Sequence, residues 1–261
     1  MSDAILDAVP AQTPEKPIRP FPGIWASIGW VILFLALQII ATVLVITAVV
    51  ARRAAAGENM SAVDPTKFMG SIGGAPIIWS LIASSLLTLF LLWLYLRRKG
   101  RLSAINLDRW SQLDIKTTVI LSVVCVGGGI GFNFLYETFV IPGTPMQDEM
   151  RKLFESIPKT AFNRAMLFGA VALLAPLTEE LLFRGLLQKS LMHRISIIPA
   201  IAISAAVFAA IHFDFYAFPA LFVMGGVFGY LYHRTGSLRV TILLHAINNG
   251  AALILSWLFP S

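Results

Sequence analysis

The stretch Ile24–Val50, IWASIGWVILFLALQIIATVLVITAVV, contains no charged side chain. An apolar run of about 18 residues or more with few charges is typical of a helix that spans a lipid bilayer. Similar runs recur along the chain and predict membrane spans at residues 24–50, 75–96, 117–140, 163–190, 196–212, 217–233 and 237–259. The sequence therefore predicts an all-α, polytopic transmembrane helical bundle of about seven spans (seven to eight).

The composition agrees with this fold class. Of the 261 residues, 57% are hydrophobic and 13% are charged, whereas an average soluble domain carries about 25% charged residues. We expect one membrane domain over residues 24–261, preceded by a polar, Ala- and Pro-rich disordered tail over residues 1–23. The tail lacks the basic start and short apolar core of a signal peptide, so we expect the first span to be retained. The one cysteine, Cys125, excludes an intrachain disulfide.

The net charge of +6 is explained by basic residues in the short loops beside the apolar spans. Lys and Arg gather in loops that stay on the cytoplasmic side. A cytoplasmic N-terminus places more of them inside than outside, so we predict an N-in, C-out, multi-pass protein of the cell membrane. If the source is bacterial, this is the plasma or inner membrane. The pattern favours a lipid bilayer, and no nucleic acid, as the partner of these charges.

The segment 145–157, between the third and fourth predicted spans, has an amphipathic pattern. Its apolar side chains fall on one helical face: Met146, Met150, Leu153, Phe154 and Ile157. This predicts a short helix at the membrane interface. We favour a connecting helix over a substrate gate, because helices in loops most often serve as connections.

Glycines cluster in two of the predicted spans. The third span contains Gly127, Gly128, Gly129 and Gly131, and the sixth contains Gly225, Gly226 and Gly229. Small residues let helix backbones approach closely in a membrane. The clusters therefore predict tight helix packing at these positions.

The last four predicted spans carry polar side chains at membrane depth: Glu179, Glu180, Arg184, His212, His245 and Asn249. On insertion scales, a charged residue at the centre of a membrane helix is unfavourable by about 2.5–3.5 kcal/mol. Such groups face a partner or a wet cavity and mark functional sites. We therefore expect an active site within the last four spans, with its core at about residues 163–259.

Glu179 and Glu180 differ in the partners that one helix offers them. Glu180 and Arg184 are four residues apart on the same face and can form an ion pair. Glu179 points about 100° away from that face and is less compensated. A carboxylate that is not taken up by an ion pair suits a general base, so Glu179 is the candidate base.

Pro176 lies three residues before Glu179 in the same span. A proline inside a helix removes one hydrogen bond, frees the carbonyl four residues earlier and kinks the helix. Two interpretations stay open at this point. The proline is either a packing kink or a break that lets water reach the carboxylate.

Two more pairs lie one helical turn apart, namely Phe208 with His212 and His245 with Asn249. A lone His or Asn in a membrane helix is more often an interhelical hydrogen-bond partner than a catalytic group. Their occurrence together with a Glu pair favours catalysis. The sequence contains neither a His-Glu-x-x-His zinc helix nor a Gly-x-Ser-x-Gly nucleophile motif.

These residues resemble three motifs of one known family. Residues 179–184, EELLFR, resemble Glu-Glu-x-x-x-Arg; residues 208–212, FAAIH, resemble Phe-x-x-x-His; and residues 245–249, HAINN, resemble His-x-x-x-Asn. In this order the chain resembles the CPBP family of intramembrane glutamic endopeptidases. That family comprises type II CAAX prenyl endopeptidases and bacteriocin-processing or abortive-infection (ABI) membrane proteins.

The resemblance implies a peptidase that forms no covalent intermediate. Glu179 and His212 would activate a water, and His245 and Asn249 would form an oxyanion hole. The residues that would support them are Glu180, Arg184 and Phe208. The implied substrate is a membrane-associated peptide or protein, and no cofactor is expected.

Three other interpretations stay open. Two histidines and a glutamate can bind zinc, so a zinc-dependent version of the same protease is the nearest alternative. Buried Glu, Arg and His side chains also build proton-coupled membrane transporters. A non-catalytic immunity protein is the third, and it predicts that Glu179→Ala leaves the phenotype unchanged.

Overall fold

A computed structural model describes residues 21–58, 74–98, 100–142, 157 and 159–258 of the chain. Within these ranges the regular secondary structure is helical, without strands. The predicted interfacial helix over 145–157 lies outside the described residues except for Ile157, and so does most of the predicted N-terminal tail.

Each of the seven predicted spans contains a helix, within a few residues of the predicted ends. The first three are α1 (Ile24–Ala55), α3 (Gly74–Leu96) and α5 (Ile115–Leu135), which the π-helix η2 (Tyr136–Val140) continues. A short helix, α4 (Arg101–Ala104), lies between α3 and α5. The last three are α10 (Ile197–Ala210), α11 (Phe218–Thr235) and α12 (Leu238–Leu258).

The fourth predicted span is one continuous helix that changes register along its length. Its consecutive parts are α7 (Ala161–Phe168), η3 (Gly169–Leu174), α8 (Ala175–Glu180), η4 (Leu181–Gln188) and α9 (Lys189–Met192), where η marks π-helical segments. Pro176 is the second residue of α8, just after η3, so it lies at a change of register and the chain stays helical. A π-segment within an α-helix often marks a functional site.

Five of the described helical segments are long and apolar enough to cross a membrane: Ile24–Ala55, Gly74–Leu96, Ile115–Val140, Ala161–Met192 and Leu238–Leu258. The chain is therefore a multi-pass membrane protein. The other two predicted spans, α10 and α11, are helices that are not both long and apolar enough to cross a membrane. A 14-residue helix such as α10 is about 21 Å long, shorter than the roughly 30 Å hydrocarbon core. Its C-terminal end, and His212 just beyond it, can therefore lie at membrane depth.

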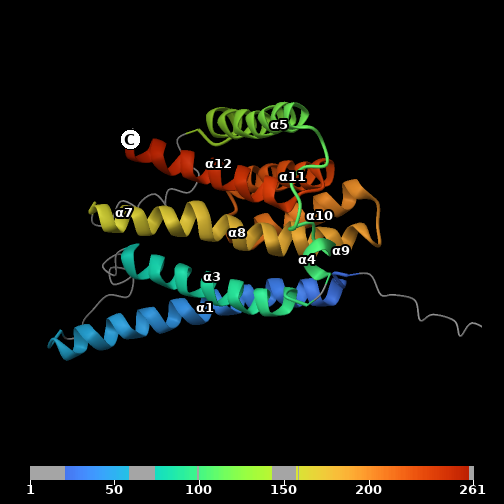
Figure 1. Ribbon diagram of the computed structural model, residues 1–261. Helices are drawn as coiled ribbons and strands as arrows, with labels where there is room; N and C mark the ends of the chain where they lie inside the picture. The colour runs from blue at the N-terminus through green and yellow to red at the C-terminus, as the bar shows by residue number, and fades with distance from the viewer. Residues whose placement is uncertain (1–20, 59–73, 99, 143–156, 158, 259–261) are drawn as a thin grey trace, which may run out of the picture.

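The helix over residues 161–192 lies at the centre of the bundle, between the α1–α3 pair on one side and α12 on the other (Figure 1). In its most apolar 18-residue window 50% of the residues are buried, against 11% in α1. The outer face of α1 shows large apolar side chains, among them Ile39, Val43 and Leu44. Lipid-facing residues of a membrane bundle have this character.

The start of α12 is held by the loop that precedes α5. Arg239 donates from Nε to the carbonyl of Leu107 at 2.7 Å, and Ser237 donates from Oγ to that of Arg109 at 2.9 Å. Gly236 ends α11 with φ of 61°, in the left-handed region that favours glycine. These contacts fix the end of the bundle from which α12 runs back to the candidate site.

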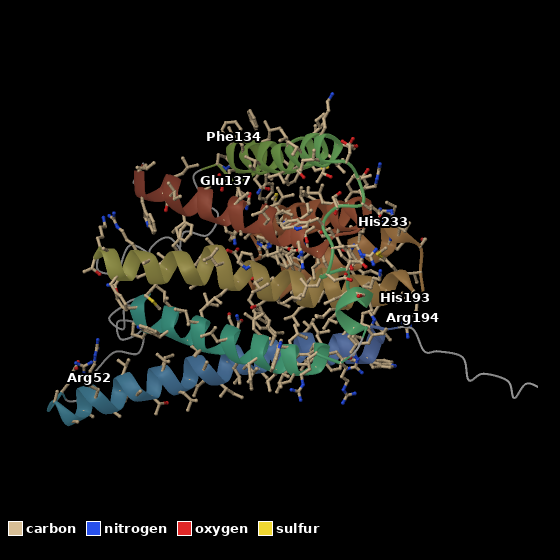
Figure 2. The ribbon with its side chains drawn as sticks, in the orientation of Figure 1. Arg52, Phe134, Glu137, His193, Arg194 and His233 are labelled. Atoms are coloured by element: carbon tan, nitrogen blue, oxygen red, sulfur yellow. The ribbon has the colours of Figure 1, made fainter. Side chains whose placement is uncertain are left out.

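The two ends of the bundle carry different charged side chains. Figure 2 shows His193, Arg194 and His233 at one end and Arg52 at the other. At the beginning of α5, Asp114 accepts a hydrogen bond from the backbone N–H of Thr117 at 2.9 Å. The side chain and backbone N–H of Thr117 hold the pKa of this carboxyl group below its ordinary value, as expected of a helix N-cap.

Candidate active site

A buried ion pair lies at the middle of the central helix. Arg184 Nη1 is 2.9 Å from Glu180 Oε1, and the side chains are 1% and 0% exposed. The predicted pairing of these two residues across one helical turn is confirmed. Because two opposite charges share the same dry environment, neither is left uncompensated.

His245 of α12 joins this pair from the neighbouring helix. Its Nδ1 is 2.9 Å from Glu180 Oε1, and its Nε2 is 3.7 Å from Glu179 Oε2. An ionised carboxylate only accepts hydrogen bonds, so we assign the donor to Nδ1 of His245. The imidazole therefore lies between the two glutamates, with Glu180 fixing its orientation and Nε2 directed towards Glu179.

The two glutamates differ in exposure. The side chain of Glu179 is 14% exposed, whereas that of Glu180 is fully buried. Their difference follows from their positions about 100° apart around one helix. Glu179 is thus the carboxylate that a water or a substrate can reach.

Aromatic rings surround the imidazole. Phe228 of α11 stacks on His245 with ring centroids 4.7 Å apart. Phe208 of α10 presents an edge contact to His245 at 6.2 Å and another to His212 at 4.9 Å. The Arg184 guanidinium lies over the Phe208 ring at 4.8 Å. Phe208 therefore contacts both histidines and the ion pair, which gives the aromatic residue of the second motif a packing role.

His212 lies in the turn after α10 and is exposed. Its Nδ1 donates to the carbonyl of Phe208 at 2.8 Å, which leaves Nε2 as the acceptor of a neutral ring. Within the described part of the chain, its hydrogen bonds do not reach Glu179 or His245. The structure thus brings His212 next to the site through Phe208, without direct contact with the candidate base.

Asn249 lies one turn after His245 on α12. Its Nδ2 donates to the backbone carbonyl of Val171 in η3 at 3.2 Å. Its Oδ1 accepts from Asn248 Nδ2 at 3.3 Å. One N–H of the amide is therefore held by the central helix, and among the described residues the second N–H has no such bond.

Gln188 belongs to the same arrangement and was missed in the sequence analysis. Arg184 donates from Nη2 to the carbonyl of Gly225, and Gln188 donates from Nε2 to that of Gly229, both at 2.9 Å. Both donors and both glycines are four residues apart, so two parallel bonds join the central helix to α11. The four-residue spacing from Arg184 to Gln188 was the signal that could have revealed this residue.

The glycine clusters behave in two ways. A Cβ atom at Gly225 would lie 3.1 Å from the Ala205 Cβ atom, and one at Gly229 would lie 2.6 Å from Gln188 Oε1. A Cβ atom at Gly225 would therefore require Ala205 to shift, and one at Gly229 would require the Gln188 side chain to move, as the predicted tight packing implies. A Cβ atom at Gly226, or at Gly127, would meet nothing within 4 Å. At these positions the prediction of tight packing is not met within the described residues.

The described side chains do not fit a zinc site. Zinc needs three or four ligands at about 2.0–2.3 Å around one point. In the described residues no group of three His, Cys, Asp or Glu side chains has that arrangement.

Comparisons with known proteins agree with the three motifs. Residues 161–251 match the family described as type II CAAX prenyl endopeptidase Rce1-like. A curated relative, the membrane-embedded CAAX protease MroQ of Staphylococcus aureus (strain USA300), is 34% identical over 96 residues. That alignment covers 34% of this chain and 39% of the relative, so the chain spans well under half of the relative's length. No solved structure matches the chain.

Residues 161–251 are therefore similar to the Rce1-like type II CAAX prenyl endopeptidases. The matched segment contains every residue of the three motifs. It begins at the first residue of α7 and ends within α12. It therefore includes the central helix, α10 and α11.

Proposed function

We propose that the chain is an intramembrane endopeptidase that hydrolyses a peptide bond in a membrane-associated protein or peptide. The observation that carries this proposal is the position of His245, held by the buried Glu180–Arg184 pair and directed at the more accessible Glu179. The match to the CAAX endopeptidase family supports the same reaction class. A bacterial source would make a peptide or membrane protein the expected substrate.

In the proposed reaction Glu179 is the general base. Its carboxylate accepts a proton from a water, whose oxygen attacks the carbonyl carbon of the scissile peptide bond. The proton then passes to the leaving nitrogen as the C–N bond breaks, which restores the carboxylate. His212, with Nε2 as an acceptor, is the proposed second contact for the water. General base catalysis of this kind contributes about 10²–10⁴-fold to the rate.

His245 and Asn249 are the proposed donors to the oxyanion. Because Nδ1 of His245 already donates to Glu180, Nε2 can donate only when the ring is an imidazolium. With Arg184, the four groups then carry two negative and two positive charges, which reduces the cost of keeping them out of water.

We propose that the reaction uses no metal ion, which the lack of a three-ligand cluster among the described residues supports. The test is peptide cleavage by the purified protein in the presence of a chelator. Undiminished cleavage supports a metal-free reaction. Activity that disappears with the chelator and returns with zinc would instead support the metalloprotease.

The proposed activity predicts that Glu179→Gln abolishes cleavage and leaves the fold intact. The measurement is comparative peptidomics of membranes from cells with the wild type and with the variant. Peptides that depend on the protein should vanish with Glu179→Gln, because the amide cannot accept the proton from water. The purified variant should show a rate lower by about 10²–10⁴-fold.

The matched control is Glu137→Gln. Glu137 is an exposed carboxylate in η2, which continues α5 (Figure 2), and its substitution should leave the peptides unchanged. Full cleavage by Glu179→Gln would refute the assignment of the base. Transport of a solute by proteoliposomes without any cleavage would favour the transporter, and a phenotype unaffected by Glu179→Gln would favour the non-catalytic protein.

A further inference from the structure

The side chain of Asn249 makes an unusual contact for a residue on a membrane helix. Its amide donates to the backbone carbonyl of Val171 at 3.2 Å, although Val171 lies within the central helix. A carbonyl inside a helix is normally taken up by an N–H of the same helix. The availability of the Val171 carbonyl to a side chain of another helix therefore needs an explanation.

The cause is the combination of a π-segment with a proline. Val171 lies in η3, where a carbonyl pairs with the N–H five residues later. For Val171 that residue is Pro176, which has no N–H to donate. The carbonyl of Val171 thus loses its backbone partner and becomes available to a side chain of another helix.

The packing brings α12 close enough to use it. Ala170 and Ala172, on either side of Val171, are both 0% exposed. A Cβ atom at Gly250 would lie 3.4 Å from the Phe168 ring and 3.5 Å from the Ala172 Cβ atom. Figure 1 shows α12 running beside the α7–α8 part of the central helix. Small residues on both helices therefore allow the Asn249 amide to reach the backbone.

We propose that Pro176 is a positioning residue for Asn249. Because Pro176 leaves the Val171 carbonyl without a backbone partner, this carbonyl accepts one N–H of the Asn249 amide. That hydrogen bond fixes the plane of the amide. The second N–H is then available to the substrate. This role rests on the proposed function, in which Asn249 donates to the oxyanion, but the link between the three residues can be tested without activity.

The first experiment is a double-mutant cycle on thermal unfolding in detergent, with Pro176→Ala and Asn249→Ala. In the wild type, Asn249→Ala leaves the Val171 carbonyl unpaired and should lower Tm. In the Pro176→Ala background the new N–H at position 176 bonds to Val171, so the same substitution should lower Tm by less than half as much. Such non-additivity is the signature of a shared contact.

The control cycle combines Asn249→Ala with Pro219→Ala. Pro219 lies in the first turn of α11, where an N–H has no helical partner, so the changes in Tm should add. If Asn249→Ala does not fold, Asn249→Leu serves, since its side chain branches at the same atom, is somewhat larger and has no donor. Additive changes in Tm for the Pro176 cycle would overturn the inference.

The second experiment measures peptide cleavage by the same variants. Pro176→Ala should lower kcat by about tenfold or more with little change in KM, because one oxyanion donor typically contributes about 10²–10³-fold. Its Tm should not fall, since alanine is the better helix former. The double variant should be no slower than Asn249→Ala alone. If Pro176 had only a structural role, Pro176→Ala would change Tm and leave kcat unchanged.

The outcomes separate the two proposals. If the wild type cleaves no peptide, the proposed function fails, and with it the role of Asn249 as an oxyanion donor. A coupled Tm cycle would even then support the link from Pro176 through Val171 to Asn249. If cleavage is found and Pro176→Ala has the wild-type kcat, the positioning role is refuted while the proposed function stands.

Discussion

At the residue scale, four ionisable side chains are held together with little access to water. Glu180 and Arg184 are almost completely buried, and His245 contacts both glutamates. A single buried charge without a partner costs several kcal/mol, whereas a group with balanced charges costs much less. The stability of this site therefore depends on the buried Glu180 keeping its partners Arg184 and His245.

Replacement of one partner should be much more harmful than replacement of both. Arg184→Leu leaves the Glu180 carboxylate buried without the guanidinium, so we expect the free energy of unfolding to fall by about 3–5 kcal/mol. The double variant Glu180→Leu with Arg184→Leu should recover part of that loss, because no unpaired charge remains. The measurement is thermal or denaturant unfolding of the purified protein in detergent.

The control for this prediction is Arg52→Leu. Arg52 is exposed in the last turn of α1, and a surface substitution usually changes stability by within about 0.5 kcal/mol. If Arg184→Leu is as stable as Arg52→Leu, the buried ion pair does not have the energetic role described here.

At the element scale, the central helix and α11 depend on close backbone contact. Gly225 and Gly229 present their carbonyls to Arg184 and Gln188 at 2.9 Å. A side chain at either glycine would require its neighbours to shift. The same face of α11 therefore gives the ion pair a hydrogen-bond acceptor and allows α10 to pack beside it.

Adjacent glycines of α11 should respond differently to alanine. Gly225→Ala places a Cβ atom 3.2 Å from the Phe208 ring and 3.1 Å from the Ala205 Cβ atom. Overpacking of this kind costs about 1–3 kcal/mol. Because Phe208 contacts both histidines, peptide cleavage should fall as well. Unfolding and cleavage assays on the purified variant measure the two effects.

Gly226→Ala is the matched control, because a Cβ atom at Gly226 meets nothing within 4 Å. Its stability should be unchanged or higher by up to about 1 kcal/mol, as helix propensity predicts. Equal destabilisation by Gly225→Ala and Gly226→Ala would contradict the close packing of α10 against α11.

At the scale of the whole molecule, the bundle has a defined direction in the membrane. Arg194 and Arg52 lie at opposite ends (Figure 2), and the distribution of basic residues predicts a cytoplasmic N-terminus. A membrane protein is accessible to a polar reagent only from the side that faces it. The two ends can therefore be assigned by chemical labelling.

The predicted topology is tested with single cysteines in a Cys125→Ser background. In intact cells an impermeant maleimide should label Arg52→Cys and should not label Arg194→Cys until the membrane is opened. The Cys125→Ser protein without an added cysteine should stay unlabelled, both in intact cells and after the membrane is opened. Labelling of Arg194→Cys alone in intact cells would show the opposite orientation.

The sequence predicted the helical segments because apolar length and charge are properties of the local chain. It also predicted the Glu180–Arg184 pair, since the spacing of residues within one helix follows from helical geometry. It did not predict that α10 is too short to cross the bilayer alone. Nor did it predict that α11 is not among the helices long and apolar enough to cross the membrane. Such helices are stabilised by packing against other helices. The hydrophobicity of one segment of sequence does not reveal that packing.

By itself, then, the sequence determined a polytopic helical membrane protein, the face shared by Glu180 and Arg184, and three motifs that resemble those of a known family. Only the tertiary structure decided that Glu180 holds His245, that Gln188 binds Gly229 and that Asn249 binds the carbonyl of Val171. Contacts within a helix depend on a fixed rise and rotation per residue. Contacts between helices depend on how closely two backbones approach and rotate, which many side chains far apart in the sequence set together.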